Sequence, residues 1–270
     1  MRLFGAEIRK LAKRPATWVT LVVLAAIVAL LYVAVGVSLT QVEDPVQRAQ
    51  TEGFITFPQA YNGVVQFAAG LGGLLAVIYG ASVAGSEWPW GTLKTAVARG
   101  ESRGRYVIVK FVAVALVLAV LLVATFGVGV GAAVAGSSLA GISLQGLGDA
   151  DTIRGLPELL AKGWLGLAEQ AAIGYVIATL ARSQLAGIGA GIALYFVEQF
   201  STLILQDAVR YLPFSVSSSL LSTGAEDGFG GGGPGFEPLD PVVALGLTVL
   251  YGLLAVLVAT AFVERAEITG

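Results

Sequence analysis

The chain has 270 residues, of which 56% are hydrophobic and only 13% are charged, about half the charged share of an ordinary soluble domain. Its 16 basic and 18 acidic residues leave a net charge of −2, so no basic field favours a nucleic acid as a partner. The absence of histidine and cysteine excludes disulfides, thiolate or imidazole metal sites and Ser-His or Cys-His catalysis. This composition predicts an all-α integral membrane protein.

Residues 1–14 predict a short amphipathic helix that lies in the membrane interface. Phe4, Ile8 and Leu11 recur on one face at helical spacing, and basic residues occupy other positions. The apolar run that follows is longer than the apolar region of a cleaved signal peptide, which has about 7–15 residues. We therefore expect the first span to be retained.

Uncharged stretches between charged residues predict six membrane-spanning helices. Crossing a hydrocarbon core about 30 Å thick takes about 20 apolar residues. The predicted spans cover about 17–39, 61–85, 106–135, 159–181, 185–205 and 241–263. Five spans, or a re-entrant segment in place of one span, are the alternatives. Very few residues separate spans four and five. This short connection predicts that the two spans form a tight antiparallel hairpin.

Basic residues are distributed unevenly between the two sides of these spans, which predicts that both termini are cytoplasmic. The cytoplasmic side then holds Arg2, Arg9, Lys10, Lys13, Arg14, Lys94, Arg99, Arg103, Arg105, Lys110, Arg182 and Arg265. The outer side holds only Arg48, Arg154, Lys162 and Arg210. The opposite orientation would reverse this asymmetry and oppose the positive-inside tendency.

Two pairs of glycines predict close helix packing in the membrane. Gly127 and Gly131 in the third span, and Gly187 and Gly191 in the fifth, have the small-xxx-small spacing that lets helix backbones approach. Packing within the chain is the main interpretation, and a seam between two copies is the alternative.

The long segment 207–240 is predicted to lie outside the membrane. Its first part, 211–221, has the composition of an interfacial helix, and 228–235 is a glycine-rich run. That run is not a phosphate-binding loop, because the chain contains no Gly-Lys pair and therefore no Walker motif. We do not expect this chain to hydrolyse ATP through such a site.

The segment 86–105 is predicted to be cytoplasmic and basic. It predicts a short helix from about Thr92 to Arg99, with Gly91 or Thr92 at its start and Gly100 in the left-handed region at its end. One interpretation is a basic loop with a surface helix. The more specific interpretation is a docking helix for a cytosolic partner.

This segment resembles the first cytoplasmic loop of ABC-2 type transporter permeases. The resemblance rests on the pattern Glu87-x3-Gly91-Thr92-Leu93-Lys94, then Arg99-x3-Arg103, then Lys110. Lys94 replaces the usual arginine, and Gly100 stands where proline is usual. Other segments are similar to the N-terminal elbow helix and to the fourth and fifth spans of that family, namely 6–11, 14–18, 180–183 and 191–198.

The resemblance implies the permease subunit of a bacterial ABC exporter in the plasma membrane, surrounded by lipid, with six spans and an elbow helix. It implies a second permease copy, identical or a paralogue, with a homodimer as the expected form. Two separate ATP-binding subunits would hold ATP and Mg²⁺, so this chain would need no cofactor and would not be an enzyme. The coupling residues implied are Glu87, Gly91, Thr92, Leu93, Lys94, Arg99 and Arg103.

Two carboxylates, Glu169 and Glu198, lie within predicted spans and are followed by Gln170 and Gln199. An ionised carboxylate at the centre of a bilayer costs at least about 2.5–3.5 kcal/mol. No basic residue lies in a span at their depth, so each must be protonated, face water or be hydrogen-bonded. We expect these four residues to line the translocation path. The alternative is a protonated glutamate hydrogen-bonded between helices.

Two other classes of function remain as alternatives. An ion- or proton-coupled secondary transporter would use Glu169 and Glu198 as its ion sites, and co-purification of an ATP-binding subunit would distinguish it from an ABC permease. An intramembrane hydrolase is the third candidate. The sequence offers it no histidine, no paired intramembrane aspartates and no set of metal ligands.

Overall fold

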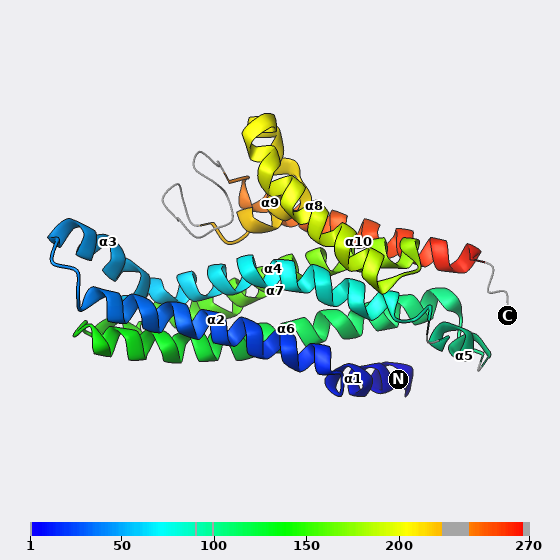
Figure 1. The fold of residues 1–270 in the computed structure, drawn as a ribbon, viewed down its shortest axis with the longest axis horizontal. Helices are drawn as coiled ribbons and strands as arrows, with labels where there is room; N and C mark the ends of the chain where they lie inside the picture. The colour runs from blue at the N-terminus through cyan, green and yellow to red at the C-terminus, as the bar shows by residue number, and fades with distance from the viewer. Residues whose placement is uncertain (1, 90, 99, 223–237, 267–270) are drawn as a thin grey trace.

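The computed structural model describes residues 2–89, 91–98, 100–222 and 238–266, which form an elongated bundle of helices (Figure 1). Strands are absent from these residues, so the all-helical prediction is confirmed for the part of the chain that the structure describes. The N-terminus, α5 and the end of α10 lie toward one end of the bundle, and α3 lies at the other (Figure 1).

Ten α-helices and two short 3-10 helices make up the described structure. The α-helices are α1 (Arg2–Ala12), α2 (Pro15–Leu39), α3 (Pro45–Ile55), α4 (Gln59–Gly85), α5 (Thr92–Ala98), α6 (Arg103–Leu139), α7 (Ala150–Ala181), α8 (Gln184–Leu205), α9 (Pro213–Ser219) and α10 (Pro241–Arg265). The 3-10 helices are η1 (Gln145–Gly148) and η2 (Gln206–Tyr211).

Five of the described helices, α2, α4, α6, α7 and α10, are long and apolar enough to cross a membrane. The predicted fifth span is helical as well, because α8 has 22 residues. At 1.5 Å per residue α8 is about 33 Å long, close to the thickness of a hydrocarbon core. A sixth span therefore stays a prediction that rests on α8.

Local sequence signals determine where several helices start. Asp44, Asp149 and Asp240 precede α3, α7 and α10, and each carboxylate accepts a hydrogen bond from a backbone N–H in the first turn of its helix. These bonds satisfy donors that would otherwise have no partner. Proline occupies the first position of α2, where its missing N–H costs no intrahelical bond.

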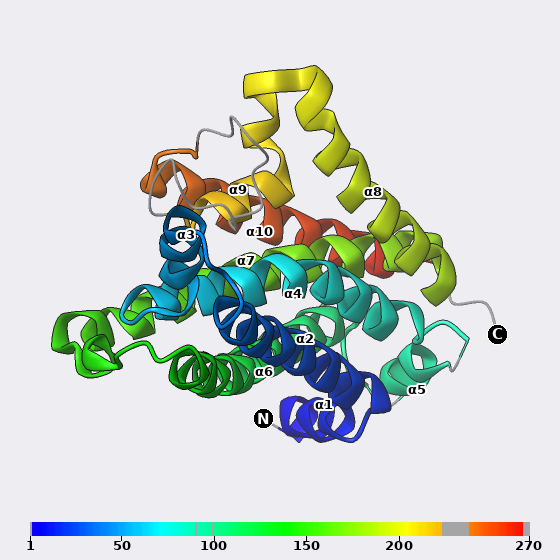
Figure 2. The same ribbon diagram turned by 60° about the vertical axis from the view of Figure 1, so that its left-hand side comes forward.

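The tightest packing joins α4 to α7, which run side by side in Figures 1 and 2. A Cβ added to Gly80 would overlap the backbone of Ala171, and one added to Gly174 would overlap the backbone of Val77. The two backbones therefore touch, as expected when small residues line a helix interface in lipid. Helices α6, α8 and α10 pack against one or both members of this pair.

The two glycine pairs behave differently. Gly187 packs on the backbone of Ala178 and Gly191 on the side chain of Val77, so the prediction of packing within the chain is confirmed for this pair. Gly127 and Gly131 have nothing within 4 Å of an added Cβ, so the same prediction is wrong for them. Both face outward on α6, whose other glycines make its close contacts.

Helices α6 and α7 extend beyond the spans predicted as 106–135 and 159–181. The 37 residues of α6 give it a length of about 55 Å. The first turns of α7 contain Pro157 and an i,i+4 ion pair between Glu158 and Lys162 at 2.7 Å. Uncharged stretches mark only the apolar part of a helix, and both helices continue beyond that part.

The segment predicted as an interfacial helix, 211–221, contains α9, but this helix is buried. Phe214, Ser215, Val216, Ser217 and Ser219 have little exposed surface. Figure 2 shows α9 between α8 and the α7–α10 pair. This helix packs into the bundle instead of lying on its surface, whereas its position relative to the membrane interface stays a prediction. The glycine-rich run 228–235 lies outside the described residues.

The turn between α7 and α8 is as tight as predicted. Arg182 adopts a left-handed conformation with φ of 51°, and α8 starts at Gln184. From this turn α8 leans away from the bundle, and η2 and α9 bring the chain back (Figure 2). Phe200 and Ile204, near the far end of α8, are consequently 65% and 81% exposed.

Candidate functional site

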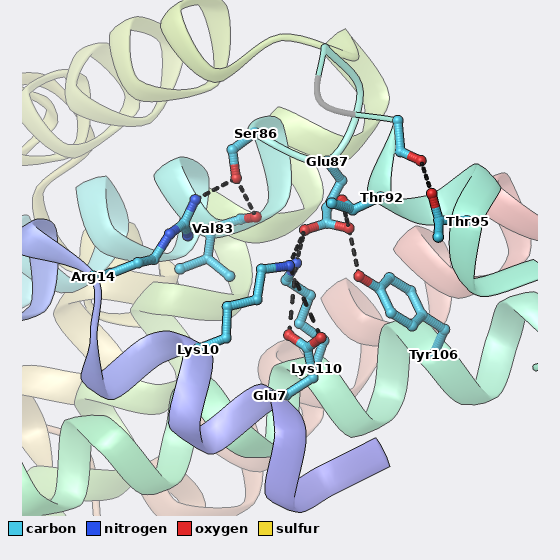
Figure 3. A network of polar contacts seen from close by, with 11 residues as sticks. Glu7, Lys10, Arg14, Val83, Ser86, Glu87, Thr92, Thr95, Tyr106 and Lys110 are labelled. Atoms are coloured by element: carbon cyan, nitrogen blue, oxygen red, sulfur yellow. Dashed lines mark hydrogen bonds and ion pairs between the residues drawn. The ribbon is translucent and has the colours of Figure 1, made fainter.

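A single buried carboxylate connects the segment after α4 to three helices (Figure 3). Glu87 is 6% exposed and follows Ser86, the C-cap residue of α4. Its Oε1 pairs with Lys110 of α6 and accepts a hydrogen bond from Lys10 of α1 at 3.4 Å. Its Oε2 accepts hydrogen bonds from the hydroxyls of Tyr106 in α6, at 2.5 Å, and of Thr92 in α5.

A second carboxylate balances the charges of this cluster. Glu7 of α1 is buried, with one oxygen 3.9 Å from Lys10 Nζ and the other 3.9 Å from Lys110 Nζ. Lys110 is only 1% exposed. Two carboxylates face two ammonium groups, so removal of one member leaves an uncompensated buried charge. We call this set, Glu7, Lys10, Glu87, Thr92, Tyr106 and Lys110, the Glu87 network.

The corner between α1 and α2 is also attached to the end of α4. Arg14 donates a hydrogen bond to the Ser86 hydroxyl at 2.5 Å, and Ser86 donates to the carbonyl of Val83 at 3.1 Å. Partial burial lowers the pKa of Arg14 from its usual value, and the nearby Tyr79 and Glu7 partly offset this effect. The predicted interfacial helix 1–14 therefore makes specific polar contacts with the bundle.

Trp88, the residue after Glu87, connects the same segment to the rest of the bundle. The guanidinium of Arg182, in the α7–α8 turn, lies 4.9 Å from the centre of the Trp88 ring and 5.3 Å from that of Phe262 in α10. Arg103, at the start of α6, donates a hydrogen bond to the carbonyl of Ala266 after α10 at 2.7 Å. Trp88, Arg103, Arg182 and Phe262, which we call the Trp88 cluster, bring the α7–α8 turn and α10 into contact with the segment 86–105.

The structure brings some of the predicted coupling residues together. Glu87 and Thr92 belong to the Glu87 network, and Arg103 contacts the end of α10. Gly91, at the start of α5, and Gly100, after its end, have φ values of 61° and 88°, in the left-handed region that favours glycine. The side chains of Leu93 and Lys94, and all of Arg99, lie outside the described residues.

Sequence reasoning missed the partners of Glu87 on α1. It placed Lys10 on the polar face of an interfacial helix, gave Glu7 no role beyond the family resemblance, and gave Tyr106 no role. Glu7 and Lys10 are one turn apart in α1, as are Tyr106 and Lys110 in α6, which is a weak signal for two facing polar surfaces.

The four predicted path residues do not share one site. Gln170 and Gln199 line a small polar cavity of about 30 Å³ between α4, α7, α8 and α9. Gln170 Nε2 donates to the hydroxyl of Ser217 at 2.6 Å, and Gln66 Nε2 donates to the carbonyl of Leu221 at 3.0 Å. The cavity is large enough to hold a water molecule, which needs about 10–15 Å³ of such space.

Glu198 lies beside this cavity but its carboxylate is turned to α9. Its Oε1 accepts a hydrogen bond from the backbone N–H of Ser215 at 2.6 Å, in the first turn of α9. The residue is 3% exposed. A carboxylate at this position satisfies a helix N–H donor and interacts favourably with the helix dipole. The contact favours the hydrogen-bonded alternative for Glu198.

Replacing Glu198 therefore tests whether it supports α9. Glu198→Leu should destabilise the fold by about 1–2 kcal/mol, because the buried N–H of Ser215 loses its acceptor. Glu198→Gln retains an oxygen acceptor and should cost less than about 1 kcal/mol. Thermal unfolding of the purified protein in detergent measures both. Equal losses in the two variants would show that this hydrogen bond does not support α9.

Glu169 lies on a different side of α7 from its neighbour Gln170, since consecutive residues are about 100° apart around a helix. It is 2% exposed, and neither carboxylate oxygen has a hydrogen-bond partner among the described residues. It lines a groove formed with α6 and α10. Glu169 therefore lines a different cavity from Gln170 and Gln199, although its carboxyl group lies within electrostatic range of Glu198.

Comparison with known proteins agrees with the resemblance drawn from the loop motif. A family model described as ABC-2 family transporter protein matches residues 1–216. The chain matches none of the curated proteins with which it was compared. The matched range contains the whole Glu87 network, the polar cavity up to α9, and most of the 270 residues. The chain therefore belongs to the ABC-2 family of transporter proteins.

Proposed function

We propose that this chain is the membrane-spanning permease subunit of an ATP-driven exporter, coupled through the segment 86–105 to separate ATP-binding subunits. Membership of the ABC-2 family, whose members generally work with ABC ATP-binding subunits, supports the partnership. The observation that carries the proposal is the Glu87 network. One carboxylate in the coupling segment contacts α1, α5 and α6 at the same time.

A force applied to α5 would reach most of the bundle through these contacts. Thr92, the first residue of α5, bonds to Glu87, which bonds to Tyr106 and pairs with Lys110 of α6. Trp88 and Arg103 extend the connection to the α7–α8 turn and to α10. Closely packed interiors transmit displacement instead of absorbing it. A docked subunit that moves α5 would therefore rock several helices together.

The orientation of the chain is proposed from its distribution of basic residues. The composition of the complex and the direction of transport are proposed from the family. We place both termini in the cytoplasm of a bacterium, with α8 as the fifth of six spans in its plasma membrane. Two ATP-binding subunits hold ATP and Mg²⁺, and a second permease copy, most simply an identical one, completes the complex. Export is the expected direction, as it is for most of the family.

Cysteine labelling tests this orientation, because the natural chain has no cysteine. Thr95 in α5 and Asp151 at the start of α7 are both exposed, so a cysteine at either position should be reachable. Asp151→Cys should react with an impermeant maleimide added to intact cells, whereas Thr95→Cys should react only after the cells are opened. The reverse pattern would place 86–105 outside the cell and remove it from ATP coupling.

We assign part of the translocation path to the polar cavity between α4, α7, α8 and α9. Gln66, Gln170 and Gln199 line this cavity inside the bundle, where polar side chains are costly without a function. At about 30 Å³ the cavity is too small for a lipid or drug, so transport requires it to widen. The lean of α8 away from the bundle makes α8 the helix best placed to move.

The two glutamates have different surroundings, which favours the permease over an ion-coupled secondary transporter. Such a mechanism would need Glu169 and Glu198 to contribute to a common ion site. Glu198 bonds to α9, whereas Glu169 lines the groove between α7 and α10. Co-purification of an ATP-binding subunit in mild detergent would support the permease, and its absence from a folded preparation would favour the secondary transporter.

A further inference from the structure

An open groove of about 520 Å³ lies on the side of the bundle between α6, α7 and α10. Its walls are almost entirely apolar, with Phe111 and Val112 from α6, Leu165 from α7, and Leu253 and Val256 from α10. This volume lies within the range of about 300–1,000 Å³ that is typical of small-molecule sites. The groove is separate from the polar cavity assigned above to the translocation path.

Glu169 is the one charged residue among the described residues that line the groove. Both of its oxygens are buried and lack a hydrogen-bond partner within the described structure. Two other side chains that line the groove could donate a hydrogen bond, but both already have an acceptor. The Thr248 hydroxyl donates to the carbonyl of Ala244 in its own helix at 2.9 Å. The Trp164 indole N–H likewise donates to the carbonyl of Ala115 at 2.7 Å.

An unpartnered carboxyl in an apolar groove favours a ligand that brings both a positive charge and N–H donors. We propose that this groove binds amphiphilic monocations, with an ammonium group against Glu169 and an apolar body along α6 and α10. An acyl chain alone would fill the groove but leave the carboxyl without a partner. Charge complementarity therefore distinguishes an alkylamine from a neutral lipid.

The ligand should enter sideways from the bilayer. Val112 and Leu116 of α6 and Leu253 of α10 line the groove and are also 48%, 45% and 57% exposed. Such apolar side chains at the mouth would face lipid in a membrane-spanning chain. The site rests on the proposed placement in the membrane but not on ATP coupling, so binding is expected without an ATP-binding subunit.

Tryptophan fluorescence offers a direct test in nanodiscs of phosphatidylcholine, because Trp164 lines the groove. The probes are a spin-labelled long-chain primary amine and the spin-labelled alcohol of equal chain length. The amine should quench the fluorescence saturably, whereas the alcohol should quench it only in proportion to its partition into the lipid. Trp164→Phe should remove the saturable part. Equal quenching by the two probes would overturn the proposal.

Substitutions then test which residues contribute to the binding of the amine. Glu169→Gln keeps the shape of the side chain and should weaken amine binding by about tenfold or more, the effect of losing a charge-assisted hydrogen bond. Glu158→Gln removes a carboxylate from an exposed position of the same helix and should leave binding unchanged. Val112→Trp should block the groove without altering Glu169. Unchanged amine affinity in Glu169→Gln or in Val112→Trp would overturn the assignment.

Discussion

Glu87→Ala is expected to destabilise the folded chain by about 3–5 kcal/mol, the usual cost of removing one partner from a buried ion pair. Lys110 is 1% exposed, so it cannot turn to water when Glu87 is lost. Glu7, at 3.9 Å from Lys110 Nζ, is the remaining counter-charge and should keep the loss near the lower end of this range. The hydroxyls of Tyr106 and Thr92 also lose their acceptor. Thermal unfolding in detergent measures the change.

Two further variants separate stability from coupling. Glu87→Ala combined with Lys110→Met removes both charges and should recover much of the lost stability. It should not recover stimulation of the partner ATPase, because the connection from α5 to α6 is still absent. Glu52→Ala breaks an exposed pair with Arg48 and should cost less than about 1 kcal/mol. A Glu87→Ala loss no larger than that of Glu52→Ala would contradict a buried, charge-balanced network.

Gly80→Leu is expected to cost about 3 kcal/mol or more and to reduce the yield of folded protein. An added Cβ would overlap the backbone of Ala171, and backbone cannot swing aside as a flexible side chain does. The α4–α7 contact must then open, which places this change at the severe end of overpacking effects. Gly174→Leu should act similarly, since its Cβ would overlap the backbone of Val77. Denaturation in mixed detergent micelles measures both.

The matched controls are two helical glycines that have free space where a side chain would be added. Gly127 and Gly131 have nothing within 4 Å of an added Cβ, so Gly127→Leu and Gly131→Leu should change stability by less than about 0.5 kcal/mol, or raise it slightly through helix propensity. If either control destabilises the isolated chain as much as Gly80→Leu, close packing of α4 on α7 is not the source of stability.

Much of the helical architecture is predictable from local sequence. Long apolar stretches predict the helices that are able to cross a membrane, and Gly91 and Gly100 predict the limits of α5. Contacts between distant elements are not encoded in this way. Gly127 and Gly131 have the same spacing as Gly187 and Gly191, yet only the second pair faces another helix. The four-residue spacing places two glycines on one face of a helix. Whether another helix packs on that face depends on the tertiary arrangement.

In the candidate site, too, local sequence predicts some residues but not the contacts between distant elements. The loop motif identifies Glu87, but its partners Lys10 and Tyr106 depend on how α1 and α6 approach the end of α4. Glu169 and Glu198 look equivalent in sequence, since each lies in a predicted span before a glutamine. The burial of α9 gives Glu198 a backbone donor, while Glu169 is among the residues that line the apolar groove. No local pattern distinguishes the two.

Photo-cross-linking from α5 tests the coupling role of 86–105 most directly. Benzoylphenylalanine replaces Thr95, an exposed residue of α5, in the chain purified together with its ATP-binding subunit. A second sample carries it at Asp151, exposed at the start of α7. We predict a cross-link to the ATP-binding subunit from position 95 and none from position 151. Cross-linking from position 151, or none from position 95 in an assembled complex, would contradict coupling through this segment.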